Sequence, residues 1–154
     1  MPTSNDLPQD RLAVGQLLGR LHREFRLELF APAAEHGYAD LREPHLQIFG
    51  NLGIDGIRLT DLAARAQLSL AATSELVNDL QELGYLERRP DSRDRRAKLI
   101  FPTARGRRAL DEAGNRVAEI EQHWADIAGR DAFDSTCRIL QDLLDSLEED
   151  RAVP

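Results

Sequence analysis

The sequence predicts a mainly α-helical protein, a winged helix-turn-helix with N- and C-terminal dimerisation helices. Three observations predict it: long stretches with apolar residues every three or four positions, two short helices with almost nothing between them, and an arginine-rich hairpin directly afterwards. Aromatic residues make up only 5% of the 154 residues, so the core must be mostly aliphatic. We expect one domain over residues 1–154, with a winged-helix lobe at 41–102 and dimerisation helices at 7–36 and 103–151.

The N-terminal third predicts two helices of unequal length. Apolar side chains recur at three- and four-residue spacing from Val14 to Leu29, which indicates an amphipathic helix from residue 7 to about residue 35. A shorter helix is expected over residues 45–51, because Gly53 and Gly56 stop it. The apolar stretch at residues 57–59 is too short to form more than a single β-bridge.

Two closely spaced helices follow. Thr60 is expected to cap the first, which continues to Gln67, and Ser69 to cap the second, which continues to about Leu83. Gly84 suits the left-handed conformation that commonly ends a helix. Because the break between the two helices is so brief, the pair is predicted to be a helix-turn-helix.

A basic hairpin comes directly after these helices. Residues 87–108 hold nine arginine or lysine residues against three acidic ones, a net +6 in a chain whose formal net charge is -7. Apolar residues on both sides of a Pro-Asp-Ser turn predict two strands that carry this charge at their tip. Such a tip suits contact with a polyanion, whereas the acidic total argues against indiscriminate coating of nucleic acid.

The C-terminal third predicts two further helices, from Thr103 to Gly129 and from about Asp131 onward. Both carry an apolar stripe at helical spacing and need a partner surface for it. Together with the N-terminal helix they could form an interdigitating homodimer interface. The stripes comprise Leu110, Ala113, Val117, Ile120, Trp124 and Ile127, then Phe133, Cys137, Leu140, Leu144 and Leu147.

The hairpin and the helix that follows it carry a specific motif. Residues 94–99, Asp-Arg-Arg-Ala-Lys-Leu, and residues 103–106, Thr-Ala-Arg-Gly, resemble the wing signature DRRxxxLxLTxxG of the MarR family of bacterial transcription regulators. Pro102 stands where the family usually has leucine. Residues 84–88 are similar to the family's RGLVER-like exit from the recognition helix, and the likeness extends over nearly the whole chain.

This resemblance implies a homodimer that regulates transcription, with repression as the first hypothesis. Its two recognition helices would enter successive major grooves of a pseudo-palindromic operator, about 34 Å apart, while wing arginines reach the flanking minor grooves. It also implies release by a small aromatic or lipophilic ligand, with no cofactor. The polar N-terminus does not resemble a signal peptide, and no apolar run is long enough to span a membrane, so we expect a soluble, cytoplasmic protein.

Residues of both parts are candidates for contact with DNA. Small groups on the recognition helix can bond phosphates or touch a thymine methyl, and an asparagine could pair with adenine. At least one wing arginine is expected at the DNA; alternatively Asp94 pairs with a neighbouring arginine and holds the hairpin, as the resemblance implies. The candidates are Arg65, Ser69, Ala72, Thr73, Ser74 and Asn78 in the helix-turn-helix, and Arg93, Arg95, Arg96 and Lys98 in the wing.

The recognition helix departs from the family pattern because it has no arginine or lysine and holds Glu75, Asp79 and Glu82. Carboxylates that face phosphates are repelled. Two interpretations remain open at this point. Either Glu75 and Asp79 are solvated or bonded to Arg65, or the chain has lost ordinary operator binding and acts as a winged-helix module that binds another protein.

Other chemistry finds less support in the sequence. The resemblance implies a ligand crevice lined by His22, Phe25, Arg26, His45 and Phe49, for which ordinary packing is the alternative. The four histidines show no close metal-ligand pairing, so no metal site is predicted, although some relatives bind zinc and a site built from distant histidines stays open.

Cys137 is expected to be a buried structural thiol. No nucleophile–base arrangement appears, so the chain is not expected to be an enzyme.

Overall fold

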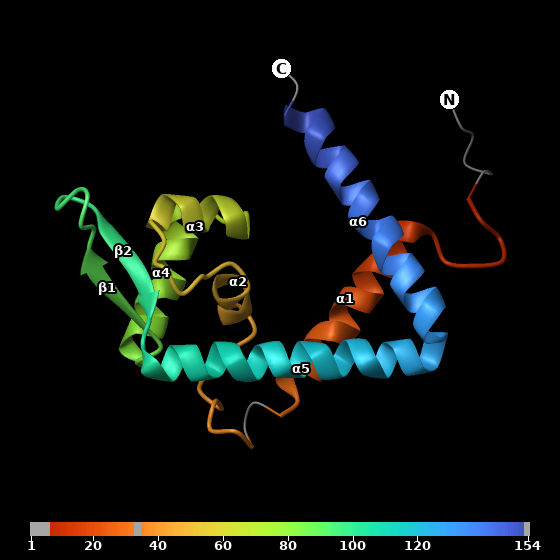
Figure 1. The fold of residues 1–154 in the computed structure, drawn as a ribbon, viewed down its shortest axis with the longest axis horizontal. Coiled ribbons are helices and arrows are strands. Elements are labelled where there is room, and N and C mark those ends of the chain that lie inside the picture. The colour runs from red at the N-terminus through yellow and green to blue at the C-terminus, as the bar shows by residue number, and fades with distance from the viewer. Residues whose placement is uncertain (1–6, 33–34, 153–154) are drawn as a thin grey trace. The chain divides into compact units, whose positions relative to one another are not determined.

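The computed structural model describes residues 7–32 and 35–152, and its elements confirm the predicted mainly α winged helix-turn-helix (Figure 1). A two-stranded antiparallel hairpin is its only sheet within the described residues. The elements are α1 Val14–Phe30, α2 His45–Phe49, α3 Leu59–Ala66, α4 Leu70–Glu82, β1 Leu86–Pro90, β2 Lys98–Pro102, α5 Ala104–Ala128 and α6 Arg130–Ala152.

Helix α1 is shorter than the predicted helix over residues 7–35. Its N-cap, Ala13, is extended, and the amide of Ala13 donates to Oε1 of Gln16 at 3.2 Å. The predicted helix began too early because the regular apolar spacing itself starts at Val14, the first residue of α1. The predicted end falls beyond Phe30, and residues 33–34 within it lie outside the described part of the chain.

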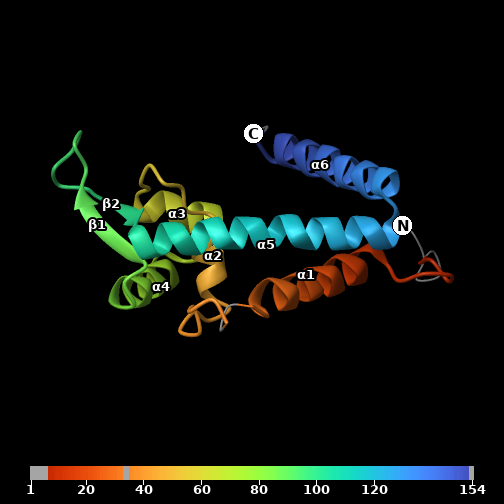
Figure 2. The same cartoon turned by 60° about the horizontal axis from the view of Figure 1, so that its bottom comes forward.

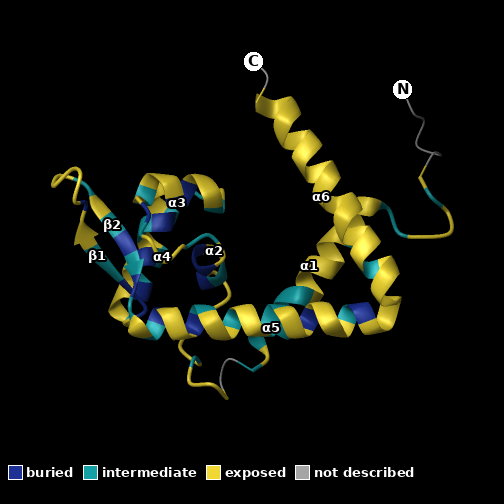
Figure 3. Ribbon diagram, in the orientation of Figure 1, coloured by how far each residue is buried: buried dark blue, intermediate teal, exposed yellow. Residues whose placement is uncertain are grey.

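The chain divides into two compact units, residues 1–114 and residues 115–154. The first holds α1 to α4, the hairpin and the start of α5, and its core lies where α2, α3 and α4 meet the hairpin (Figure 3). The second holds the rest of α5 and the whole of α6. Helix α6 has no buried residue within the described chain, whereas Ile120 and Ala125 of α5 are buried. No described helix combines the length and the apolar character that crossing a bilayer requires.

The helix-turn-helix is built by two local signals. Gln67 adopts a left-handed conformation, with φ of 54°, and so turns the chain between α3 and α4. Ser69 then caps α4 as predicted, since its Oγ accepts from the amide of Ala72 at 3.1 Å. The prediction that Thr60 caps α3 is wrong: the N-cap is Arg58, whose extended backbone starts the helix without a side-chain cap.

The wing is the hairpin of β1 and β2, paired from Leu86 opposite Pro102 to Pro90 opposite Lys98. The predicted single bridge is confirmed between Ile57 and Ile100, and it joins the wing to the chain before α3. Figures 1 and 2 both show the tip of the hairpin reaching beyond α3 and α4. The tip is therefore the projecting part of this lobe.

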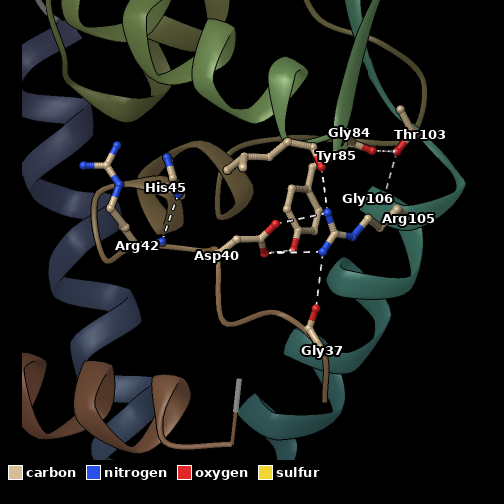
Figure 4. Close-up of polar contacts among 10 residues, drawn as sticks. Gly37, Asp40, Arg42, His45, Gly84, Tyr85, Thr103, Arg105 and Gly106 are labelled. Carbon is tan, nitrogen blue, oxygen red and sulfur yellow. Dashed lines mark hydrogen bonds and ion pairs between the residues drawn. The ribbon is translucent and has the colours of Figure 1, made fainter. Parts of the chain in front are cut away.

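Thr103 and Gly106 join the wing to α5 (Figure 4). The amide of Thr103 donates to the carbonyl of Tyr85 at 2.9 Å, and its hydroxyl donates to the carbonyl of Gly84 at 2.6 Å. The same hydroxyl accepts from the amide of Gly106 at 3.1 Å. A Cβ on Gly106 would lie 2.1 Å from the Tyr85 carbonyl oxygen, so only glycine fits. This explains the Thr-x-x-Gly pattern.

Candidate nucleic-acid interface

The outward face of the recognition helix α4 is set by its buried face. Thr73, Val77 and Leu80 are buried, so the positions opposite them at helical spacing face outward. These are Ala71, Glu75, Asn78 and Glu82, all exposed.

The expectation that Thr73 faces DNA is wrong. Its side chain is fully buried, and its Oγ1 donates to the carbonyl of Ser69 at 2.8 Å. The residue shares a face with Val77, four positions later, which packs into the core. Thr73 therefore belongs to the support of the helix-turn-helix.

The other helix-turn-helix candidates remain accessible. Ser69 and Arg65 are exposed, and Ala72 and Ser74 are half-buried. Within the described residues, Arg65 forms no ion pair with Glu75 or Asp79, so the expected pairing with Arg65 is wrong. Glu75 is exposed, which agrees with the alternative that it is solvated. Contact of these four candidates with DNA stays a prediction.

Asp79 is neutralised by a different arginine. Nη2 of Arg42, from the loop before α2, lies 2.8 Å from Oδ2 of Asp79. Nε2 of the buried His45 lies 3.7 Å from the same oxygen. The Asp79 carboxylate is therefore directed toward α2 and the loop before it, and it links α4 to them. Because Arg42 neutralises it, it adds little negative charge to the outward face of α4.

A second arginine reaches α4 from the wing. Nη2 of Arg88, on β1, donates to Oδ1 of Asn78 at 2.9 Å, and its Nη1 donates to Oε1 of Gln81. Arg88 thereby brings a positive charge to a helix that has no basic residue of its own. Sequence reasoning missed this role, because Asn78 and Arg88 are ten positions apart and the turn at Gly84 lies between them.

The tip of the wing is held by Asp91, which is buried. Its Oδ1 accepts from the amide of Arg93 at 3.0 Å, and its Oδ2 accepts from Nη2 of Arg58 at 3.0 Å. The amide of Arg93 and then the guanidinium of Arg58 hold the pKa of Asp91 below its ordinary value. The sequence signal for the first bond was an aspartate two residues before the amide it accepts from, an Asx turn.

In the part of the chain that the structure describes, Asp94 forms no ion pair with a neighbouring arginine, so the alternative that the resemblance implied is wrong. Its Oδ1 accepts from the amide of Arg96 at 3.1 Å, and its carbonyl accepts from the amide of Ala97 at 3.0 Å. The carboxylate is used to shape the turn, whereas Arg58 and Asp91 supply the ion pair that joins the wing to the lobe.

The basic side chains of the tip are consequently available. Within the described residues, none of them donates a side-chain hydrogen bond or forms an ion pair, and all are exposed. They extend from a turn fixed by two aspartates, so the backbone that carries them is ordered before any partner arrives. These side chains are Arg93, Arg95, Arg96 and Lys98.

Arg105 contributes to the charge of residues 87–108 but has a structural role. Its Nη1 donates to the carbonyl of Leu83 at 2.6 Å and lies 3.1 Å from Oδ2 of Asp40 (Figure 4). Its guanidinium also covers the ring of Tyr85, 4.2 Å from the centroid. Burial raises the pKa of Asp40, but hydrogen bonds from Tyr85 and Arg105 outweigh it and hold that pKa below its ordinary value.

Two of the residues expected to line a ligand crevice are buried in the described chain. His45 and Phe49 are buried in the core, where Phe49 meets Tyr85 edge to face at 5.8 Å, so the expectation that they face an open crevice is wrong. Arg26 is paired with Glu43 at 2.7 Å. The remaining two, His22 and Phe25, lie on α1 and are exposed and half-buried respectively.

His45 gives the lobe a predicted dependence on pH. Its Nδ1 accepts from the amide of Arg42 at 2.9 Å, so the neutral ring carries its proton on Nε2. Burial, helped by the charge of Arg42 and opposed by Asp79 and Asp40, lowers the pKa of His45 in the folded chain. Below about pH 6.5 the His45 ring binds a second proton in the unfolded chain, whereas the folded chain resists this protonation. The free energy of unfolding therefore decreases as the pH is lowered, by up to about 1.4 kcal/mol for each pH unit.

Urea unfolding at pH 7.5 and 5.5 measures this effect. His45→Asn keeps an acceptor near the position of Nδ1 and removes the titration, so the variant is expected to lose less stability than the wild type between the two pH values. The other three histidines remain in both proteins and cancel in the comparison. An identical loss in wild type and variant would contradict this role of His45.

The described residues do not form a metal site, and the single cysteine does not lie where it was expected. No group of three or more His, Cys, Asp or Glu side chains is placed to hold a metal ion among these residues. Cys137 is exposed in the single chain, so the expectation that it is buried there is wrong. It lies on α6, which has no buried residue within the chain.

Comparison with known proteins agrees with this architecture. Residues 39–97, from the loop before α2 to the tip of the wing, match the model of the MarR family. No curated protein matches the chain in sequence. Among solved structures, CouR from Rhodococcus jostii bound to p-coumaroyl-CoA is 27% identical with a TM-score of 0.71, over 94% of this chain and 95% of that one.

Two further structures extend the comparison. A transcriptional regulator of the MarR family from a Rhodococcus species is 26% identical with a TM-score of 0.66, over 87% of this chain and 91% of that one. The reduced form of MarR from E. coli is 17% identical with a TM-score of 0.73, over 88% of this chain and 99% of that one. The last similarity concerns the fold alone.

Proposed function

We propose that this chain, a winged-helix protein of the MarR family, is a homodimeric DNA-binding regulator of transcription that recognises a pseudo-palindromic operator. The observation that carries the proposal is the wing tip, where Arg93, Arg95 and Arg96 extend, unpaired within the described chain, from a turn fixed by Asp91 and Asp94. Guanidinium groups on an ordered, projecting turn suit the negative potential of a narrow minor groove.

The helix-turn-helix supports the same proposal. In such a complex, α4 would enter the major groove with Asn78 and Ser74 near the base edges, while the wing follows the adjacent minor groove. The acidic residues of α4 oppose DNA binding less than the sequence alone implies. Arg42 neutralises Asp79, and Arg88 lies against Asn78 and Gln81. A protein-interaction module that has lost DNA binding is therefore not favoured.

The terminal helices support a dimer. Helix α1 exposes Val14, Leu18 and Leu21 at spacings of four and three residues, an apolar stripe with no cover in the single chain. Helix α6 exposes a longer stripe, and neither helix has a buried residue. A second copy of the chain would cover both stripes. The exposed apolar residues of α6 are Ile139, Leu140, Leu143, Leu144 and Leu147.

Regulation by a small ligand and a repressor role are part of the proposal. A relative at 27% identity is bound to p-coumaroyl-CoA, which supports a small aromatic or lipophilic effector here. The effector would act by binding better to a dimer whose recognition helices do not match the operator, so that DNA is released. The protein would work in the cytoplasm, where its DNA is.

Binding to the DNA upstream of the chain's own gene tests the proposal. Fluorescence anisotropy at about 0.15 M salt, with sedimentation of the complex, should find two chains on one duplex and at least about 10³-fold preference over unrelated DNA. A chain that sediments as a monomer, or that binds all duplexes equally, would rule out the proposed regulator.

A further inference from the structure

The amide oxygens of two side chains on α4 are occupied by one guanidinium. Arg88 donates through Nη2 to Oδ1 of Asn78 at 2.9 Å and through Nη1 to Oε1 of Gln81. Asn78 and Gln81 are three residues apart and so lie side by side on the helix, where both are exposed. The guanidinium has only donors, so it fixes which end of each amide remains available.

Arg88 is well placed to hold this arrangement. Its backbone is paired with Ile100 in the hairpin, and Ile100 is buried and bridged to Ile57. The arginine side chain is itself half-buried. The amides of Asn78 and Gln81 are therefore oriented by a residue that is anchored in a different element.

The arrangement has a consequence for base recognition. An asparagine reads adenine with both ends of its amide, because Oδ1 accepts from N6 and Nδ2 donates to N7. With Oδ1 already accepting from Arg88, the two N–H groups of Nδ2 are the least engaged part of the amide. Guanine presents two major-groove acceptors to them, N7 and O6, whereas adenine presents N7 beside an N6 donor, which Oδ1 could accept only with its second lone pair, next to the guanidinium.

We propose that Arg88 and Asn78 form one base-reading unit that favours guanine, with its two hydrogen-bond acceptors, over adenine in the major groove. The inference rests on the proposed function, since it concerns how the operator is read. Arg88 is a positioning residue: it turns Asn78 into a donor. It also adds positive charge to a face that includes Glu75 and Glu82.

Selection of bound duplexes from a randomised half-site library tests this unit with three proteins. The wild type is expected to enrich guanine at one position. Asn78→Asp keeps an acceptor for Arg88 but has no N–H group, so the preference at that position should disappear and affinity should fall about tenfold. This loss identifies the position that Asn78 reads. Arg88→Met frees Oδ1, so enrichment at that position should shift toward adenine.

Arg89→Met is the matched control. It removes the same charge from the neighbouring residue of β1, but Arg89 pairs with Glu87 and covers the ring of Phe101. The control should keep the wild-type base preference. An operator with adenine at the position read by Asn78, or an unchanged preference in Arg88→Met, would overturn the inference alone. A wild type that enriches no sequence would instead overturn the proposed function, and this inference with it.

Discussion

Replacing Arg95 and Arg96 together by alanine is expected to lower operator affinity roughly a hundred- to a thousand-fold at about 0.15 M salt. Both side chains lie at the exposed wing tip without a partner in the described chain, so their removal should leave the fold unchanged. A dimer would lose up to four contacts with phosphates or the minor groove. The slope of log affinity against log salt should then fall by about 0.9 for each lost contact, measured by anisotropy over a salt series.

A control with the same change in net charge separates a local contact from general attraction. Arg138→Ala with Arg151→Ala removes two positive charges from α6, far from the wing in sequence. This pair is expected to change affinity only a few-fold. Equal losses in the two double variants would mean that the wing has no special role at the DNA.

Gly106→Ala is expected to destabilise the chain by about 3 kcal/mol or more. The added Cβ would lie 2.1 Å from the carbonyl oxygen of Tyr85, which already accepts from the amide of Thr103 at 2.9 Å. Backbone must move to admit the methyl group, and the start of α5 would separate from the base of the wing. Urea unfolding followed by circular dichroism measures the loss.

Gly114→Ala is the matched control in the same helix. A Cβ at Gly114 meets no atom within 4 Å, and the residue is exposed. Alanine there should stabilise the helix by about 0.5–1 kcal/mol because it restricts the unfolded chain. If Gly106→Ala were as well tolerated as Gly114→Ala, the close contact with Tyr85 would not exist in the folded protein.

Features that depend on neighbours in sequence could be predicted. The cap at Ser69, the left-handed Gly84 and the bridge at Ile57 are all confirmed. The cap and the left-handed glycine depend on residues within a few positions, so the local sequence contains their signal. The short apolar run at Ile57 predicts a bridge but does not reveal its distant partner, Ile100. The order of the helices and the wing could be predicted for the same reason.

Features that depend on distant partners could not be predicted. Asp79 pairs with Arg42, 37 residues away, and Asp91 pairs with Arg58, 33 residues away. Arg105 reaches back 65 residues to Asp40. Many arginines and carboxylates in this chain could have paired, and only the folded backbone decides which ones do. The expected pairs of Asp79 with Arg65 and of Asp94 with an arginine were local guesses that tertiary structure overrode.

The burial of Thr73 was missed for a different reason. Its neighbours Ala72 and Ser74 are also small, so polarity does not reveal which of the three turns inward. The period set by Val77 and Leu80 places Thr73 on the buried face. This signal was present in the sequence. A count of helical positions from the apolar residues could have found it.

Hydroxyl-radical footprinting of the operator complex tests the central claim most directly, because it maps minor-groove contacts along each strand. The account predicts two protected minor-groove segments, related by a dyad and lying outside the major-groove half-sites. These protections should disappear selectively in the Arg95→Ala and Arg96→Ala double variant. A specific complex without flanking protections, or with protections that this variant leaves intact, would contradict the account.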